Sequence, residues 1–424
     1  MSSVTASAPP WANRWQSGLS YGAPGFPLAF VALPLYVVLP NHYAREFGVP
    51  LALLGAVLLG ARLFDAVVDP LIGRWADKLL DRSAAAAWGA VAIAAVVLAL
   101  GFHGLFFPVV AHTTTALLTW CAALLAVTYL SYSVITVIHQ AWGARLGGDE
   151  AQRTRVVAWR EGLALCGVLV ASVLPSVAGL GVTTLVFAFA LAAGVFMLRD
   201  APQPNAAVHA ANAPSLRLPL HTPAFRRLLA IYLLNGIASA VPATLVLFFI
   251  RDRLQSPSYE PLFLASYFAA AALSIPLWVR VVARFGLARA WLAGMLLAIA
   301  VFAWAALLGA GDVVAYTLVC VLSGIALGAD LSLPAALLAG VVQSAGHGGR
   351  AEGAYFGWWN FATKLNLALA AGVALPVLQA FGYAPGSQSP QALSALTVAY
   401  CVLPCLLKLA AAALLWFQWI KAPT

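Results

Sequence analysis

Residues 200–222 read DAPQPNAAVHAANAPSLRLPLHT, and this polar stretch near the middle of the chain decides the layout of everything around it. On either side, the 424-residue chain consists largely of long apolar runs; 63% of all residues are hydrophobic and only 9% are charged. A soluble domain carries about 25% charged residues. The solvent for most of this chain must therefore be lipid, and the sequence predicts an integral membrane protein.

The apolar runs predict about twelve membrane-spanning helices, because a helix needs about 20 apolar residues to cross a bilayer. Six runs precede the polar stretch and six follow it: 22–42, 50–72, 85–107, 113–143, 156–179 and 182–198, then 224–250, 259–282, 287–309, 313–342, 354–381 and 391–418. We predict an all-α membrane protein with a six-helix bundle over 1–199, a cytoplasmic linker over 200–222 and a second six-helix bundle over 223–424. Six spans, a linker and six spans is the layout of the major facilitator fold.

The basic residues predict the orientation of the chain. With both termini and the linker in the cytoplasm, most Lys and Arg residues outside the spans fall on the cytoplasmic side, and the opposite side keeps Arg45, Arg251 and Arg253. This is the positive-inside pattern, so the net charge of +9 does not indicate a nucleic-acid partner. No cleavable signal peptide is visible. We expect a monomer in a bacterial-type inner (plasma) membrane.

Charged residues inside the apolar spans are the first functional candidates, because each costs about 2.5–3.5 kcal/mol or more at a helix centre. They are Arg62, Arg160, Lys364 and Lys408, with Asp65, Asp69, Glu161 and Asp330. Such residues persist where they face a cavity or a partner. Lys408 stands alone on the last span, where packing or snorkelling explains it equally well.

The densest cluster lies on the second span, in the segment Arg62-Leu-Phe-Asp65-Ala-Val-Val-Asp69-Pro70. The spacing of three and four places Arg62, Asp65 and Asp69 on one helix face. Two carboxylates at about 6 Å repel by roughly 3 kcal/mol at an effective dielectric constant of about 20. Arg62 can neutralise one of them, and the other needs a proton or a metal cation. The pattern favours a cation-coupling site over an internal salt bridge that only fixes helix packing.

With these residues in hand, the chain resembles the glycoside–pentoside–hexuronide:cation symporters, the melibiose-permease branch of the major facilitators. Four segments carry the resemblance: Asp65-Ala-Val-Val-Asp69-Pro70-Leu-Ile-Gly73 with Asp77 and Lys78, Arg153-Thr-Arg-Val-Val-Ala-Trp-Arg160, Ser274-Ile-Pro276-Leu-Trp278, and Arg350-Ala-Glu352-Gly353-Ala-Tyr355-Phe356 continuing to Lys364. The resemblance implies that Asp65 and Asp69 form the cation site, that Lys364 approaches it, and that Arg160 lines the cavity. We assign conformational gating to the end of the second span, at Gly73, Asp77, Lys78 and Arg82.

The departures from the family pattern bear on the substrate and the ion. Where sugar-transporting members carry acids on their first and fourth helices, this chain has Pro27 and Thr136, so a simple pyranoside is not the expected substrate. Val68 stands where sodium-using members often have an amide, and valine offers no oxygen to a metal ion. We therefore favour a proton over sodium as the coupling cation. A sodium ion at Asp65 and Asp69 is the one metal considered.

Further residues are expected in the substrate cavity. Asp330 precedes Pro334 on the tenth span and is interpreted as a second protonation site, as a site for a cationic substrate group, or as the partner of Arg160 or Lys364 in an ion pair. Trp358 and Trp359 are expected to touch the substrate. His139 is either a proton relay or a packing histidine. Glu161 points about 100° away from Arg160 on a helix and is expected to face a neighbouring helix.

Taken together, these features predict a cation-coupled symporter of a small organic solute that works by alternating access. A lysolipid or other amphiphile transporter on the same scaffold is one alternative, and a glycoside symporter with an altered sugar site is another. The sequence contains no His-Glu-x-x-His, no Gly-x-Ser-x-Gly and no Gly-rich phosphate loop ending in Lys-Ser or Lys-Thr, so an enzyme or nucleotide-driven transport is not expected. No cofactor is expected beyond the coupling proton or sodium ion.

Overall fold

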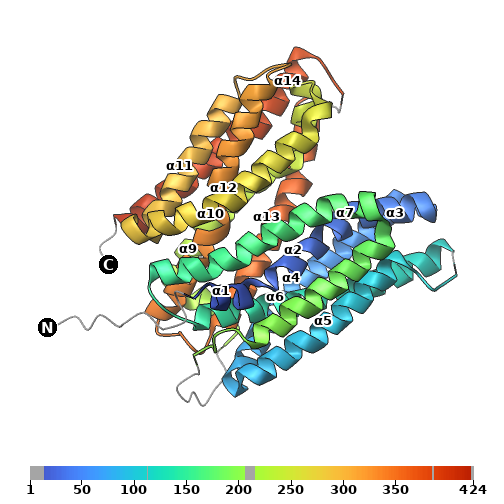
Figure 1. Ribbon diagram of the computed structural model, residues 1–424. Coiled ribbons are helices and arrows are strands. Elements are labelled where there is room, and N and C mark those ends of the chain that lie inside the picture. Colours follow the sequence, from blue (N-terminus) through green and yellow to red (C-terminus); the bar gives the residue numbers. More distant parts are fainter. Residues whose placement is uncertain (1–13, 112, 206–214, 384–385, 422–424) are drawn as a thin grey trace. The chain divides into compact units, whose positions relative to one another are not determined.

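The computed structural model describes residues 14–111, 113–205, 215–383 and 386–421, and every regular element in these residues is helical (Figure 1). Internal contacts divide the chain into two units. Unit 1 comprises Met1–Leu218 and Val342–Trp358, and unit 2 comprises Pro219–Val341 and Trp359–Thr424. A segment from the second half of the sequence thus packs with the first six spans. The predicted domain boundaries at 199 and 223 stay a prediction.

Unit 1 begins with a helix that is repeatedly interrupted by proline, which removes backbone donors. Its pieces are α1 (Trp15–Gly22), α2 (Gly25–Leu33), the π-helical turn η1 (Pro34–Val38) and α3 (Leu39–Glu46). Four longer helices complete the unit: α4 (Leu51–Arg82), α5 (Ala84–Phe106), α6 (Thr114–Arg145) and α7 (Glu150–Arg199).

The helix α7 contains two of the predicted spans, because its chain turns back at Gly179. This residue has φ 78° and ψ 171°, a conformation that favours glycine. Before the turn, Gly167 lies against the backbone of Phe26; after it, Gly194 lies against Pro24. In a continuous helix Gly167 and Gly194 would be separated by about 40 Å. Both can meet neighbouring residues of the first span only because the two arms form a hairpin, which agrees with predicted spans at 156–179 and 182–198.

Unit 2 is also built from helices and short helical turns. The short α8 (Leu218–His221) leads into it, and its elements are α9 (Pro223–Phe248), η2 (Phe249–Arg253), η3 (Pro257–Tyr259), α10 (Glu260–Phe285), α11 (Leu287–Ala305), α12 (Val313–Ser344), α13 (Glu352–Ala380), α14 (Pro390–Thr397), η4 (Val398–Val402), α15 (Leu403–Leu415) and η5 (Trp416–Ile420). The last turns of α12 and the first turns of α13 belong to unit 1.

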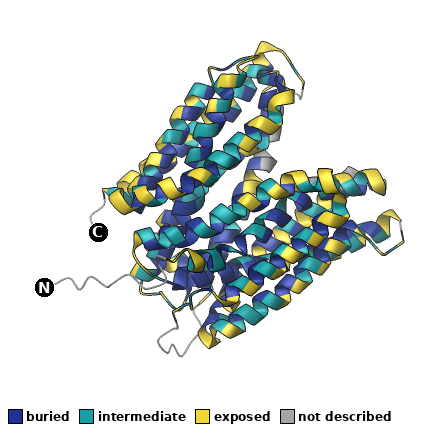
Figure 2. Cartoon of the chain, viewed as in Figure 1, coloured by how far each residue is buried: buried dark blue, intermediate teal, exposed yellow. Residues whose placement is uncertain are grey.

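The helices have the length and composition of membrane spans. Among the described residues, nine segments are long and apolar enough to cross a bilayer, and α4 and α13 add helices of 32 and 29 residues. Exposed residues lie along the helices of both units (Figure 2), and large apolar residues are among them, such as Phe189 and Leu273 with 77% and 81% of their surface exposed. In water such exposure would be unfavourable, whereas in a bilayer these side chains pack against lipid.

Candidate transport site

The charged face predicted on the second span exists in unit 1 and is largely buried. Asp69 is fully buried and Asp65 is 6% exposed. The hydroxyl Oγ of Ser133, on α6, donates a hydrogen bond of 2.6 Å to Oδ1 of Asp65. The Arg62 guanidinium lies over the ring of Tyr36, 3.4 Å from its centroid. One helix therefore holds two buried carboxyl groups and a cation one turn apart, and α6 supplies a hydroxyl beside them.

Glu161 forms an ion pair with Arg160, its neighbour in α7. Its Oε1 accepts hydrogen bonds from Nε and Nη2 of Arg160, at 3.0 and 2.7 Å. The side chains are long enough to bridge the 100° between consecutive helix positions, and desolvation of Arg160, which is 8% exposed, favours the pairing. Glu161 thus neutralises Arg160.

His139 is fully buried, and its contacts are those of a packing residue. Its Nε2 lies 2.6 Å from the backbone oxygen of Tyr21, and the two rings are 4.6 Å apart. The hydroxyl of Tyr21 in turn donates to the backbone oxygen of His139. This reciprocal pair joins α1 to α6 and fits the packing alternative.

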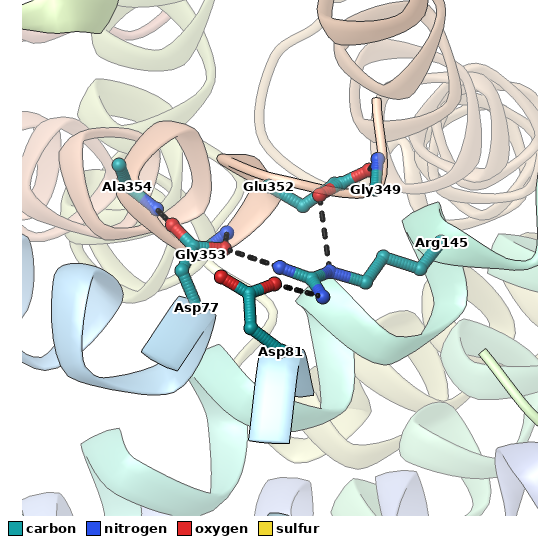
Figure 3. Close-up of polar contacts among 7 residues, drawn as sticks. All are labelled: Asp77, Asp81, Arg145, Gly349, Glu352, Gly353 and Ala354. Atoms are coloured by element: carbon teal, nitrogen blue, oxygen red, sulfur yellow. Dashed lines mark hydrogen bonds and ion pairs between the residues drawn. The ribbon is translucent and has the colours of Figure 1, made fainter. Parts of the chain in front are cut away.

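The predicted gating segment at the end of α4 forms an ion network with residues far away in sequence (Figure 3). Arg145, whose side chain is fully buried, is its centre. Its guanidinium lies 3.1 Å from Oδ1 of Asp77, 2.8 Å from Oδ1 of Asp81 and 3.1 Å from Oε2 of Glu352. Asp77 and Glu352 are buried, whereas the side chain of Asp81 is 31% exposed. Three helices, α4, α6 and α13, thus meet at one guanidinium.

Asp77 also caps the N-terminus of α13. Its two carboxylate oxygens accept hydrogen bonds from the backbone N–H groups of Gly353 and Ala354, at 2.7 and 2.8 Å (Figure 3). The first N–H groups of a helix have no partner within the helix, and the helix dipole favours a negative charge there. A carboxylate from α4 therefore completes the start of a helix 276 residues further along the chain.

The cap depends on a close approach between the two helix backbones. A methyl group on Gly73 would lie 2.8 Å from the carbonyl carbon of Gly353, and one on Gly357 would lie 2.9 Å from Cα of Pro70 and 2.6 Å from the carbonyl oxygen of Asp69. Small residues spaced four apart allow helices in a membrane to pack this closely. The α4–α13 contact therefore runs along α4 from the buried aspartate to the ion network.

In unit 2, Asp330 pairs with Lys408, which overturns the proposed pairing with Arg160 or Lys364. The Lys408 ammonium donates to Oδ2 of Asp330 at 2.7 Å, to Oδ1 of Asn235 at 2.7 Å and to the hydroxyl of Ser239 at 3.2 Å. Asp330 accepts further hydrogen bonds from Asn235 and from the indole of Trp291. Lys408 is thus the partner of a largely buried acid, and snorkelling does not describe it.

The other predicted cavity residues are distributed over both units. Pro27 is buried in α2 and Thr136 is half-buried in α6. The indole of Trp358 donates to the backbone oxygen of Leu216 in unit 1, and Trp359 stacks on Tyr232 in unit 2 with ring centroids 3.7 Å apart. Lys364 is half-buried in unit 2, so its predicted approach to the aspartates of unit 1 stays a prediction. Lys78 and Arg82 are exposed.

Several residues of these networks were missed by sequence reasoning: Asp81, Ser133, Arg145, Asn235, Ser239 and Trp291. The partners of Arg145 lie 64 to 207 residues away. No local signal in the sequence marks it, because the acids that it meets stand among basic residues: Asp77, Asp81 and Glu352 among Arg74, Lys78, Arg82 and Arg350. Ser133 carries no signal of its own, because one hydroxyl in an apolar span is ordinary.

Comparison with known proteins gives the fold and a family. Residues 20–422 match a family described as MFS/sugar transport protein. The inner membrane symporter YicJ of Escherichia coli (strain K12) is 28% identical over 162 residues, which are 37% of this chain and 33% of that protein. The match therefore spans about a third of the relative's length.

Two solved structures share the fold over nearly the whole chain. One is a bacterial homologue of the iron transporter ferroportin in an outward-facing state, with a TM-score of 0.72 at 16% sequence identity. The match covers 96% of this chain and 100% of the homologue's chain. The Major Facilitator Superfamily transporter FucP from E. coli, in the outward conformation, has a TM-score of 0.69 at 14% identity and covers 96% of this chain and 99% of its own. The predicted all-α major facilitator fold is confirmed.

Proposed function

This chain belongs to the MFS/sugar transport protein family, and from that premise we propose that it is a cation-coupled symporter of a small organic solute. The family makes it an integral membrane protein and a secondary transporter, and the expectation that it is no enzyme agrees with the family and with both structural neighbours. The family resemblance seen in the sequence is confirmed at the level of this family. The coupling ion, its site and the substrate class are our proposal.

The observation that carries the proposal is the burial of two carboxyl groups on one face of α4. Asp65 and Asp69 are one turn apart, and at most 6% of either residue is exposed. Two carboxylates this close cannot both stay charged at low cost, because desolvation and mutual repulsion act together. A bound proton or cation relieves both penalties. Loading and release of that cation is what a symporter needs at its coupling site.

The same helix offers a route from the cation to the gate. Asp69 and Asp77 are eight residues apart, or about 12 Å along α4. Between them, α4 touches α13 backbone to backbone at Gly73 and Gly353, and at Asp69 and Gly357. A change of charge at Asp69 that tilts or shifts α4 would therefore act directly on the cap at the start of α13. We propose that α4 is the element whose position depends both on the bound ion and on the contacts of the gate.

The ion we propose is a proton. The hydroxyl of Ser133 donates a hydrogen bond to Asp65, and Val68 offers no oxygen to a metal ion where sodium-using members often have an amide. Sodium prefers several oxygen ligands, whereas a carboxyl group takes up a proton without them. The substrate is a small organic solute other than a simple pyranoside, since Pro27 and Thr136 provide no carboxylate for sugar hydroxyls.

The test begins with a thermal-shift screen of the purified protein against sugars, organic acids, amino acids and lysolipids, because a ligand that binds the folded state raises its apparent stability. Uptake of the ligand found is then measured in proteoliposomes under separately imposed proton and sodium gradients. We expect a proton gradient to drive accumulation, and Asp65→Asn and Asp69→Asn to abolish it while the protein stays folded. Glu46→Gln, at an exposed carboxylate, is the matched control.

Two outcomes contradict different parts of the proposal. Uptake that depends strictly on sodium, without any response to a pH gradient, contradicts the proton as the coupling ion but not the coupling site at Asp65 and Asp69. Normal accumulation of the substrate by both aspartate variants contradicts the coupling site itself.

A further inference from the structure

Unit 2 contains a cavity of about 160 Å³ that no part of the proposed coupling mechanism uses. Five segments line it: α9, α10, α11, α12 and the chain from η4 into α15. All of its lining residues belong to unit 2. Packed helices leave few hollows larger than a water molecule, because every lost contact costs stability. A hollow of this size therefore has room for a small molecule.

Six aromatic side chains line the cavity: Phe263, Tyr267, Phe268, Phe302, Tyr316 and Tyr400. The hydroxyls of Tyr316 and Tyr400 are hydrogen-bonded to each other at 2.7 Å. Phe263 stands edge-on to Tyr316 with ring centroids 4.8 Å apart. These contacts hold Phe263, Tyr316 and Tyr400 in place, and aromatic surfaces of this kind suit another ring in an offset or edge-on arrangement.

The charged part of the lining has no net charge. Asp330 and Lys408 are the charged residues of the lining, and they neutralise each other at 2.7 Å. The three donors of the Lys408 ammonium are directed to Asp330, Asn235 and Ser239, and Asp330 accepts from Trp291 as well. A charged ligand would have to break this network and bring an uncompensated charge into an apolar site. A neutral ligand meets no such cost.

We propose that this cavity is a binding site for a neutral molecule of about one ring, aromatic or alicyclic, with a hydroxyl or similar group directed to the Asp330–Lys408 pair. The size agrees: an apolar cavity of about 150 Å³ in another protein holds one benzene molecule. The site is separate from Asp65 and Asp69, which lie in unit 1, so it does not depend on the assignment of the coupling ion.

The experiment uses 4-fluorophenol as the probe, with the full-length protein in lipid nanodiscs. Fluorine-19 NMR separates a saturable shift or broadening from simple partition into lipid, which does not saturate at low probe concentration. Ala326→Phe and Ser323→Leu fill the cavity from α12. Leu318→Phe adds a ring to the same helix at a position that is 50% exposed, and is the matched control. The anion 4-fluorobenzoate and the cation 4-fluorobenzylammonium test the requirement for a neutral ligand.

We expect saturable binding of 4-fluorophenol to the unmodified protein and to Leu318→Phe, at least tenfold weaker binding to the two cavity-filling variants, and at least tenfold weaker binding of both charged probes. If Ala326→Phe does not fold, the affinity of Ser323→Leu for 4-fluorophenol decides the test. Binding that is equal in all variants, or that never saturates, refutes the site. Tight binding of either charged probe refutes the neutral class of ligand.

Discussion

Replacing Gly73 by alanine is expected to loosen the contact between α4 and the start of α13. The new methyl group would lie 2.8 Å from the carbonyl carbon of Gly353 and 3.2 Å from Cα of Ala354. Ordinary contacts of a methyl carbon begin at 3.4 Å. Both neighbours are backbone atoms, which cannot rotate away as a flexible side chain can. The carbonyl oxygen of Gly353 would lie closer still, so the two helices must separate by at least about 0.6 Å, the difference between 2.8 and 3.4 Å.

The separation acts on the cap that Asp77 provides. Its hydrogen bonds from Gly353 and Ala354, now 2.7 and 2.8 Å, would lengthen to at least about 3.3 and 3.4 Å, beyond the usual range of about 2.7–3.2 Å. A hydrogen bond to a charged group contributes about 1.5–3 kcal/mol. Weakening two of them by half costs the closed contact about 2 kcal/mol, which is roughly 30-fold in its equilibrium constant.

Hydrogen–deuterium exchange measures this effect directly, because the two capped amides report their own opening. In the protein reconstituted in lipid, we expect a peptide covering 349–356 to exchange roughly 30-fold faster in Gly73→Ala. Gly60→Ala is the control, since it adds the same methyl group to the same helix with no atom within 4 Å. Equal exchange in the two variants would refute the argument that the close approach maintains the cap.

Two further predictions concern the polar residues of the spans. Lys408→Met leaves the carboxylate of Asp330 without its cation and should lower the free energy of unfolding by about 3–5 kcal/mol. The double variant Asp330→Asn with Lys408→Met should recover most of this free energy. Thermal unfolding of the two variants measures the difference, and an equal loss of stability in both would contradict the pairing. Melibiose-type galactosides should give neither thermal stabilisation nor saturable uptake, because Pro27 and Thr136 provide no carboxylate, and tight binding of such a sugar overturns this reading.

The fold could be predicted because its determinants are local. Apolar runs, a polar linker and the bias of Lys and Arg are each visible within about 20 residues, and they identified two spans even where α7 is one helix broken at Gly179. The face of α4 that carries Asp65 and Asp69 was equally accessible, since helix periodicity alone places the two on one side. Both residues are buried as the cost of intramembrane charge suggests.

The partners could not be predicted, because they are set by packing between distant segments. Asp330 lies 78 residues from Lys408, and periodicity within one helix gives no information about which helix lies opposite. Asn235 and Ser239, which complete that network from α9, are ordinary polar residues in sequence. The same holds for Asp77, whose role in capping α13 depends on the position of a helix start far along the chain.

The pairing of Lys408 with Asp330 also changes the charge count on which coupling depends. Counted from the sequence without Lys408, four acids face three bases; the structure removes Asp330 from the surplus, since Lys408 neutralises it within unit 2. In the spans of unit 1, Glu161 is likewise neutralised by Arg160. Asp65, Asp69, Arg62 and Lys364 remain, two acids and two bases. A cation that loads the two aspartates has to compete with Lys364, which keeps its predicted role as a competitor. Because we propose that one cation binds there in each cycle, we expect one positive charge to enter with each neutral solute. Reversal potentials in proteoliposomes measure this ratio, and electroneutral uptake of a neutral solute would contradict it.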